Sequence, residues 1–494
     1  MIYPWILLVL VGTSYAFHLC KPGNPLAAGP SSCCKPGLLP HPSLRASADH
    51  GIVDKSTSTV FDQSLLIAGT TIGGGFLALP RATSPGGFLP SAVGLVASWL
   101  YLLSAATALA DATIAVSEIE GEANCGGGSP TVSVFRVAHF VLGSRAATCV
   151  GATFGVLAIS TLVAQLSKSG ALLADCMPPA LTAFVGGARG FTFAFALVMA
   201  AVTWAGGAVF AERTNNALTA LMLASFASMA IFAARVGVPS RLLRANWPSL
   251  LPLPLGRPSS TGGQVAWAVP VLLQLLVYSE CVPYVTRRLG CDRNKVRRAL
   301  AFGSFIPLCM CLLWAAAAIA VMPYASPDGT TAVLSAALSD PVARLLAASG
   351  GADLRLLQGS ILLLAGSAIS TTVIGSLLTT MQFLQDVARV PPDTLPATGH
   401  TIRLRLGLRI VALAPCTLIA AFGGRGLYYA ATAFAGAFPV VLLWGLFPAV
   451  AYYRMRSHLP KEEADAHFSS PFPLINIVFS AAMLLVNVIN VYFR

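Results

Sequence analysis

The chain has 494 residues, of which 56% are hydrophobic and only 10% are charged, with a mean hydropathy of +0.74. So few charges exclude an ordinary soluble domain, and the long apolar runs predict an all-α polytopic membrane protein. The net charge of +12 comes mainly from arginines between the apolar runs, with no basic helix interleaved with aromatic residues. We therefore expect contact with anionic lipid and no nucleic-acid partner.

Residues 1 to about 58 are predicted to be a targeting presequence rather than part of the fold. Residues 1–16 have a short apolar core followed by small residues, as in a signal peptide, but no basic start. Residues 17–58 have no acidic residue before Asp49, which is typical of a transit peptide. This order, with Phe17 after the expected cleavage point, resembles the bipartite presequence of complex plastids. It implies a plastid membrane; the alternatives are a signal anchor with a disordered tail, and an endomembrane or the plasma membrane.

About eleven apolar runs are long enough to cross a bilayer as helices. With the mature N-terminus inside, most arginines and lysines fall in inner loops, as the positive-inside rule requires, and the linker 236–262 is the main exception. Residues 133–144 form a short amphipathic segment that is expected at the membrane interface. The predicted spans cover about residues 61–81, 88–116, 147–175, 190–208, 216–235, 264–287, 299–322, 356–384, 404–423, 427–452 and 472–493.

The first span has a glycine-rich interruption. Backbone that leaves the helix at membrane depth is stable only where it lines a cavity or binds something polar. We therefore expect a broken helix at a binding site, as in many secondary transporters. The poor helix formers at the centre of this span, and the predicted substrate-binding residues, are Gly69, Thr70, Thr71, Gly73, Gly74 and Gly75.

The sixth span is interrupted as well, at Tyr278, Ser279 and Glu280, with Pro283 just beyond. A proline removes a backbone hydrogen bond, and an acid at mid-membrane depth is costly unless it faces a cavity or a partner. The two interruptions are five spans apart, which predicts a five-plus-five inverted repeat with the binding site between broken helices 1 and 6. The alternative for each interruption is a kink in a packed bundle.

The eighth span carries a group of hydroxyl side chains at the depth where the inverted repeat would bring it near the first span. These hydroxyls are candidates for supporting an ion or the substrate. The alternative is that they only bond to carbonyls of their own helix. The residues concerned are Ser370, Thr371 and Thr372.

The sequence around the two interruptions and the eighth span resembles the tryptophan/tyrosine permeases, which are aromatic amino acid transporters of the amino acid–polyamine–organocation superfamily. It looks most similar to their plastid-type members. The family motif AGTxIGxGxLALP is matched by residues 68–80, and its GSxIPL motif by residues 303–308. The resemblance covers about residues 60–493 and implies a leucine-transporter-type fold. The chain departs from the family at the aromatic-His-Asn triplet, which is Tyr278-Ser279-Glu280 here, and at the second-span Glu, which is Asp111.

The resemblance implies a secondary active, proton-coupled amino acid transporter that favours tryptophan and tyrosine, with sodium as the alternative ion. Free N–H groups at the first break are expected to hold the substrate carboxylate, and carbonyls near Val277, Tyr278 and Ser279 its ammonium. Glu280 and Asp111 are the candidate proton carriers. The alternatives are a transporter of other neutral amino acids or small amines, or a channel-like protein. No HExxH, GxSxG or Walker motif occurs, so we expect no enzyme, and no metal or other cofactor.

Overall fold

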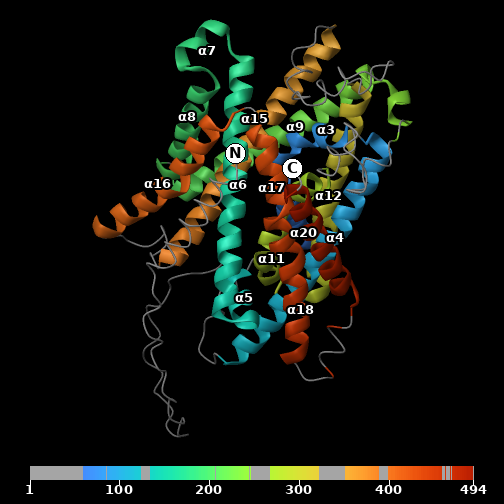
Figure 1. The fold of residues 1–494 in the computed structure, drawn as a ribbon, viewed down its shortest axis with the longest axis vertical. Coiled ribbons are helices and arrows are strands. Elements are labelled where there is room, and N and C mark those ends of the chain that lie inside the picture. The colour runs from blue at the N-terminus through green and yellow to red at the C-terminus, as the bar shows by residue number, and fades with distance from the viewer. Residues whose placement is uncertain are drawn as a thin grey trace, which may run out of the picture.

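The computed structural model describes residues 59–84, 86–123, 134–205, 207–243, 245, 268–321, 351–388, 399–424, 426–458, 462, 468 and 470–492. The predicted presequence lies outside the described residues. The described part of the chain is helical almost throughout (Figure 1). In the order of the chain, the helices of the first half are α2 (Val60–Thr71), η1 (Gly74–Ala78), α3 (Leu79–Thr83), α4 (Phe88–Ala123), α5 (Val134–Leu142), α6 (Ser144–Cys176), α7 (Pro179–Val185), α8 (Gly187–Ala200), η2 (Ala201–Ala205), α9 (Gly207–Val236) and η3 (Pro239–Leu243).

The second half repeats the pattern of long apolar helices. Its helices are α10 (Ala268–Leu275), η6 (Ser279–Cys281), α11 (Val282–Arg288), α12 (Arg293–Val321), α15 (Ala352–Ala388), α16 (Gly399–Phe422), α17 (Leu427–Ala437), η7 (Val441–Leu446), α18 (Phe447–His458) and α20 (Phe472–Tyr492).

Eleven membrane spans are present in the described residues if the bent pair at the start of the chain is one span. Ten helices are long and apolar enough to cross a membrane, and α2 together with η1 and α3 forms the further span, bent by 47°. Each of them falls on one of the predicted apolar runs. The prediction of an all-α polytopic membrane protein is confirmed.

Corresponding helices of the two halves make corresponding contacts. The first span packs against the seventh, α2 against α12, and the sixth packs against the second, α10 and α11 against α4. The third packs against the eighth, α6 against α15, and the fourth against the ninth, α8 against α16. Since five is an odd number, helices related by this offset cross the membrane in opposite directions. The packing therefore has the pattern of the predicted five-plus-five inverted repeat.

Both predicted interruptions are breaks in the helices. The α-helical bonding of α2 ends at Thr71, and the chain continues after Gly73 as a 3₁₀ turn, η1. In the sixth span, α10 ends at Leu275 and helical structure resumes only at Ser279. Gly75 lies against the second break, because a Cβ on it would be 3.1 Å from a methyl carbon of Leu275. The two non-helical segments are therefore neighbours at the centre of the bundle.

One end of the bundle is rich in arginine and lysine, and we call it the basic end. The helices α2, α6, α12 and α16 begin there, and α11 and α18 end there. In Figure 1 the lower end, with α5, α11 and α18, is the basic end, and α7 lies at the opposite end. The basic residues here include Arg136, Arg145, Arg287, Arg288, Arg293, Lys295, Arg297, Arg298, Arg403, Arg405, Arg409, Arg454 and Arg456. The arrangement is the one expected if this end faces the inner side of the membrane.

The short helix α5 has the two-sided character that its sequence predicts. Val137, Ala138 and Val141 are buried, whereas Phe135 and Phe140 are exposed. It packs against α4, α6 and α18 at the basic end of the bundle. An amphipathic helix in this position buries one face on the bundle and offers the other to the membrane interface.

Candidate functional site

A cavity of about 640 Å³ lies between the two breaks. Its walls come from the first, third, fifth, sixth, seventh, eighth and tenth spans, so both halves of the molecule contribute. The lining residues at the breaks are Gly69, Thr70, Thr71, Ile72, Gly73, Gly75 and Phe76 from the first span and Leu275, Val277 and Glu280 from the sixth.

The cavity extends from the breaks to the basic end of the bundle. Asp62, in the first turn of α2, lines it, as do Asn215 and Thr219 in the first half of α9 and Thr379 in the last part of α15. All of these positions lie between the breaks and the basic end. The structure therefore has an inward-facing shape, with the site reachable from the basic end.

At the first break, side chains from other helices bind the backbone groups that leave the helix. The N–H of Gly74 donates to Oγ1 of Thr372 at 2.6 Å. The hydroxyl of Tyr428 donates to the carbonyl of Gly74 at 2.8 Å and to that of Gly75 at 3.2 Å. The indole N–H of Trp314 donates to the carbonyl of Phe76 at 3.0 Å. The irregular backbone is thus stabilised without the lipid having to accept or donate a hydrogen bond.

Two donors at this break remain free. Among the described residues, the N–H groups of Gly73 and Gly75 have no hydrogen-bond acceptor, and both glycines line the cavity. At the second break, the carbonyls of Leu275, Leu276 and Val277 accept no backbone hydrogen bond from described residues. One side of the site therefore offers N–H donors and the other offers carbonyl acceptors.

The glycines of the first break are needed because other side chains press against them. A Cβ on Gly73 would meet Oγ1 of Thr372, and a Cβ on Gly74 would overlap Oε1 of Gln165 and lie 3.0 Å from the backbone of Ile369. By contrast, a Cβ on Gly69 would have free space around it. Close packing thus explains why Gly73 and Gly74 have no side chain. Gly75 has no side chain at a position that lines the cavity.

Glu280 is an acid that faces the cavity. Its side chain is exposed and lines the cavity beside the second break. Among the described residues it has no ion-pair partner. Its neighbour Cys281 lies 3.9 Å from Oγ1 of Thr70, which joins the ends of the two breaks. A carboxyl at this position can take up or release a proton through the water-accessible cavity.

The hydroxyls of the eighth span fall into two groups. Those of Ser370 and Thr371 donate to carbonyls of their own helix, at 2.8 and 3.0 Å, which is the alternative that the sequence left open. The hydroxyl of Thr372 also donates to its own helix, to Ala368 at 2.7 Å, but it accepts the N–H of Gly74 as well. Thr371 and Thr372 line the cavity. Only Thr372 joins the eighth span to the first break.

Besides Gly74 and Ser370, three predicted residues lie outside the lining of the cavity. Tyr278 and Ser279 are buried at 1% and 0% exposure and do not line it. Asp111 is also outside its lining, and its carboxylate accepts a hydrogen bond from the guanidinium of Arg297 at 3.0 Å. The structure therefore brings Glu280 to the cavity and places Asp111 in an ion pair between α4 and α12.

The family model described as the tryptophan/tyrosine permease family matches residues 56–488. The chain belongs to this family. It is therefore an integral membrane transporter of an aromatic amino acid permease family and not an enzyme. The permease is 22% identical over 399 residues to the tryptophan-specific transport protein of Haemophilus influenzae, with 79% of this chain and 88% of that protein covered.

Solved structures of a manganese transporter are among those to which this chain is similar. Two mutants of the Eremococcus coleocola manganese transporter align with the permease at a TM-score of 0.47, with 16% and 17% sequence identity. Each alignment covers 86% of this chain and 85% of the other.

Sequence reasoning missed several polar residues that line the cavity of the permease. Gln165 on α6 is 3% exposed, and among the described residues its Oε1 has no hydrogen-bond partner. The Oε1 of Gln274, at the end of α10, is also buried without one. The signal that could have found them is an amide inside an apolar span, since such a group needs a partner. The other missed polar lining residues are Asp62, Thr161, Asn215, Asn216, Thr219, Ser376, Thr379 and Thr432.

Proposed function

We propose that the permease is a secondary active transporter that carries tryptophan or tyrosine together with protons. The observation that carries this proposal is the pairing of free donors and free acceptors across one cavity. The N–H groups of Gly73 and Gly75 lie on one side, and the carbonyls of Leu275 to Val277 lie on the other. An α-amino acid has a carboxylate that needs donors and an ammonium that needs acceptors.

The substrate carboxylate binds the N–H groups of Gly73 and Gly75, where no side chain intervenes. Its ammonium binds the carbonyls at the second break, with the carboxylate of Glu280 nearby. A cavity of about 640 Å³ is within the usual size of small-molecule sites and large enough for an indole or phenol side chain. The membership in the permease family and the tryptophan-specific relative support an aromatic substrate.

Glu280 carries the coupling proton in this proposal. It is the acid that lines the cavity at the second break, and no described residue pairs with it. An ionised Glu280 adds an attractive charge and acceptor oxygens for the ammonium, whereas a protonated Glu280 presents an O–H donor and has no charge. During transport, water reaches this side chain first from one side of the membrane and then from the other. Glu280 can therefore take up a proton on one side and release it on the other.

Purified permease in liposomes tests the proposal directly. Uptake of labelled tryptophan should be saturable, should exceed equilibrium when the lumen is alkaline, and should be inhibited by unlabelled tyrosine. Leucine and small amines should compete weakly. A sodium gradient that drives accumulation without a pH gradient would contradict proton coupling. Saturable uptake of leucine with none of tryptophan would contradict the aromatic substrate, and non-saturable flux would indicate a channel.

The proposed location is a membrane of a complex plastid. Its support is the order of a signal-like segment and an acid-poor segment in residues 1–58, with Phe17 at the expected junction. A fluorescent protein fused behind residues 1–58 should enter the plastid of an alga with complex plastids, and replacing Phe17 by Ala should stop it in the endomembrane system. Retention of both fusions at the plasma membrane would contradict this location.

A further inference from the structure

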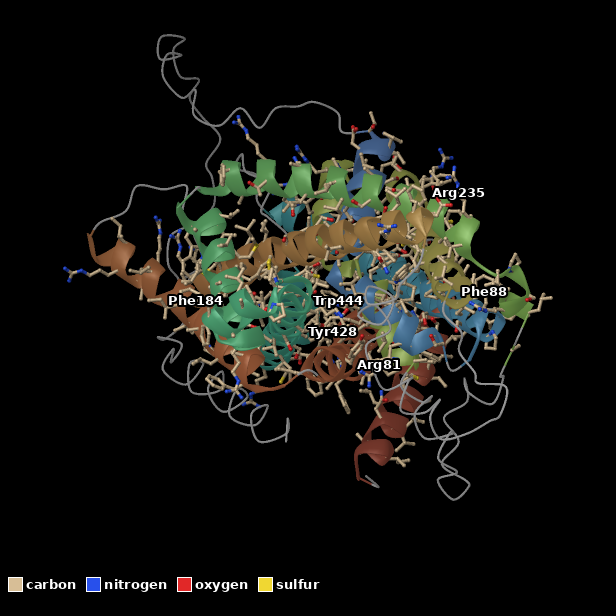
Figure 2. All side chains as sticks on the ribbon, turned by 90° about the horizontal axis from the view of Figure 1, so that it is seen from above. Arg81, Phe88, Phe184, Arg235, Tyr428 and Trp444 are labelled. Atoms are coloured by element: carbon tan, nitrogen blue, oxygen red, sulfur yellow. The ribbon has the colours of Figure 1, made fainter. Side chains whose placement is uncertain are left out.

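Two cations and two tyrosines from α3, α6 and α17 form a cluster on the side of the breaks away from the basic end. The guanidinium of Arg81, on α3, lies 4.1 Å from the centre of the Tyr429 ring. The ammonium of Lys168, on α6, lies 5.5 Å from the Tyr428 ring and 5.9 Å from the Tyr429 ring. The two rings on α17 meet edge to face with centres 4.9 Å apart, and Figure 2 labels Arg81 and Tyr428 among the side chains of the bundle. None of these four residues, which we call the tyrosine–cation cluster, lines the cavity.

Lys168 and Tyr428 are buried, whereas Arg81 and Tyr429 are half-buried. Lys168 is 3% exposed and Tyr428 is 1% exposed. A cation over an aromatic face is attracted by the ring, more strongly where water is excluded. The cluster therefore fixes the position of the Tyr428 ring relative to α6.

Tyr428 also reaches the first break directly. Its hydroxyl donates to the carbonyl of Gly74, which belongs to the same peptide unit as the N–H of Gly75. In a trans peptide the C=O and N–H bonds point in opposite directions. A carbonyl that is held toward Tyr428 therefore turns the N–H of Gly75 away from α17. Gly75 lines the cavity, and this N–H has no acceptor among the described residues.

We propose that Tyr428 is a positioning residue for the substrate carboxylate, and that Lys168 acts through it. The hydroxyl holds the peptide between Gly74 and Gly75 so that the Gly75 N–H is available to the carboxylate. Lys168 holds the ring in place while the outer side is closed. This inference rests on the proposed function, because it concerns how that site binds its substrate.

The test compares tryptophan with tryptamine, which has the same ring and ammonium but no carboxylate. In Tyr428→Phe, the apparent KM for tryptophan uptake should rise roughly tenfold, the factor that a lost hydrogen bond of ordinary strength gives. The inhibition constant of tryptamine should stay unchanged, because tryptamine does not use the Gly75 N–H. A variant that only loosens the fold would change both values together.

Tyr101→Phe is the matched control. Tyr101 is also buried, at 7% exposure, and its hydroxyl forms a hydrogen bond of 2.7 Å, but with Ser480 at a site remote from the breaks. This variant loses the same group and should keep the wild-type KM for tryptophan. Both variants are compared at equal amounts of protein in the liposomes.

A double-mutant cycle tests the role of Lys168. Lys168→Met alone should raise the KM for tryptophan several-fold, and it should add nothing in the Tyr428→Phe background, since residues that act through one another are not additive. Additive effects would overturn the proposed order of action. If Tyr428→Phe does not reach the membrane, Lys168→Met decides by itself: an unchanged KM for tryptophan overturns the inference.

The outcome separates this inference from the proposed function. If the wild-type permease takes up no aromatic amino acid, the proposed function fails. If it takes up tryptophan and the KM of Tyr428→Phe equals that of the wild type, only the positioning role fails.

Discussion

Gly74 is enclosed by three helices at once. Its N–H donates to Thr372 and its carbonyl accepts from Tyr428, while the amide of Gln165 occupies the space that a Cβ would need. Every polar group of this residue's backbone is therefore in use, and no volume is left for a side chain. The N–H groups that are available for a ligand belong to its two neighbours, Gly73 and Gly75.

Replacing Gly74 by Val should abolish tryptophan uptake. The new side chain would displace Gln165 and the backbone of α15 at Ile369, which opens the packing around the break. Uptake per molecule of protein in the membrane measures the effect. Gly366→Ala on α15 is the matched control, since a Cβ there meets nothing within 4 Å, and it should retain full uptake. Normal uptake by Gly74→Val would rule out a closely packed site at this residue.

Glu280→Gln should remove the effect of a pH gradient on accumulation while equilibrium exchange of tryptophan continues. The amide keeps the size of the side chain but carries no titrating proton. Asp111→Asn is the informative comparison, because Asp111 is the other predicted carrier and lies in an ion pair with Arg297. It should keep pH-driven uptake. Loss of the pH response in Asp111→Asn alone would assign the proton to Asp111.

At the scale of a single element, the start of α12 shows how a local motif holds the basic end. The carboxylate of Asp292 accepts the backbone N–H of Lys295 at 3.1 Å and that of Asn294 at 3.0 Å, so it caps the helix. The N–H of Lys295 is the main reason why the pKa of Asp292 lies below its ordinary value of 3.8. The nearby ammonium of Lys295, at 3.5 Å, is exposed and contributes little.

Asp292→Ala should lower the melting temperature of the purified permease at neutral pH. The pKa of Asp292 is lower in the folded state than in the unfolded state. The cap therefore contributes its full stability at pH values above the unfolded pKa, and this contribution is lost as the pH falls through the folded pKa. The difference from wild type should therefore shrink below pH 3.8. Lys295→Met, which removes the ion pair but leaves the cap, should melt like the wild type. A constant difference at all pH values would contradict the role of the carboxylate.

The breaks themselves are elements that sequence predicts well. Gly73 lies at the first place where helical bonding stops, and the second break, Leu276 to Tyr278, begins just before the predicted region Tyr278 to Pro283. The sequence locates both because helix propensity is a local property. The direction in which each side chain of a break points depends on the packing of distant segments, not on the neighbouring residues in the chain. Tyr278 and Ser279, both expected at the substrate, are buried away from the cavity, whereas Val277 and Glu280 line it.

At the scale of the whole molecule, the cavity reaches toward the basic end, and the tyrosine–cation cluster lies on the other side of the breaks, outside the cavity lining. The polar face of α9, with Asn215, Asn216 and Thr219, forms part of the open path beside the first turns of α2. An alternating-access transporter exposes one fixed site first to one side and then to the other. Under the proposed function, the structure is the inward-facing member of such a pair.

A cysteine placed at Thr219 should react with a membrane-impermeant thiol reagent applied at the basic end. Tryptophan should slow the reaction, because the substrate closes the path around the site. Ser225→Cys is the control, since Ser225 lies on the same helix, is 5% exposed and does not line the cavity. Labelling is measured above the background of the wild-type cysteines, in vesicles of both orientations. Reaction of Thr219→Cys only from the opposite side would contradict the inward-facing assignment.

The amino-acid sequence by itself determined the spans, the two breaks and the basic end. These features depend on local hydrophobicity, on glycine and proline, and on the charge of the loops, all of which are read along the chain. The tertiary structure alone decided which side chains meet the breaks. Thr372 and Tyr428 are about 300 residues or more from Gly74 in the chain, and Arg297 is 186 residues from Asp111. Such pairs form because helices from both halves pack around one cavity, and the rotation of each helix in that packing is fixed by the side chains of all its neighbours.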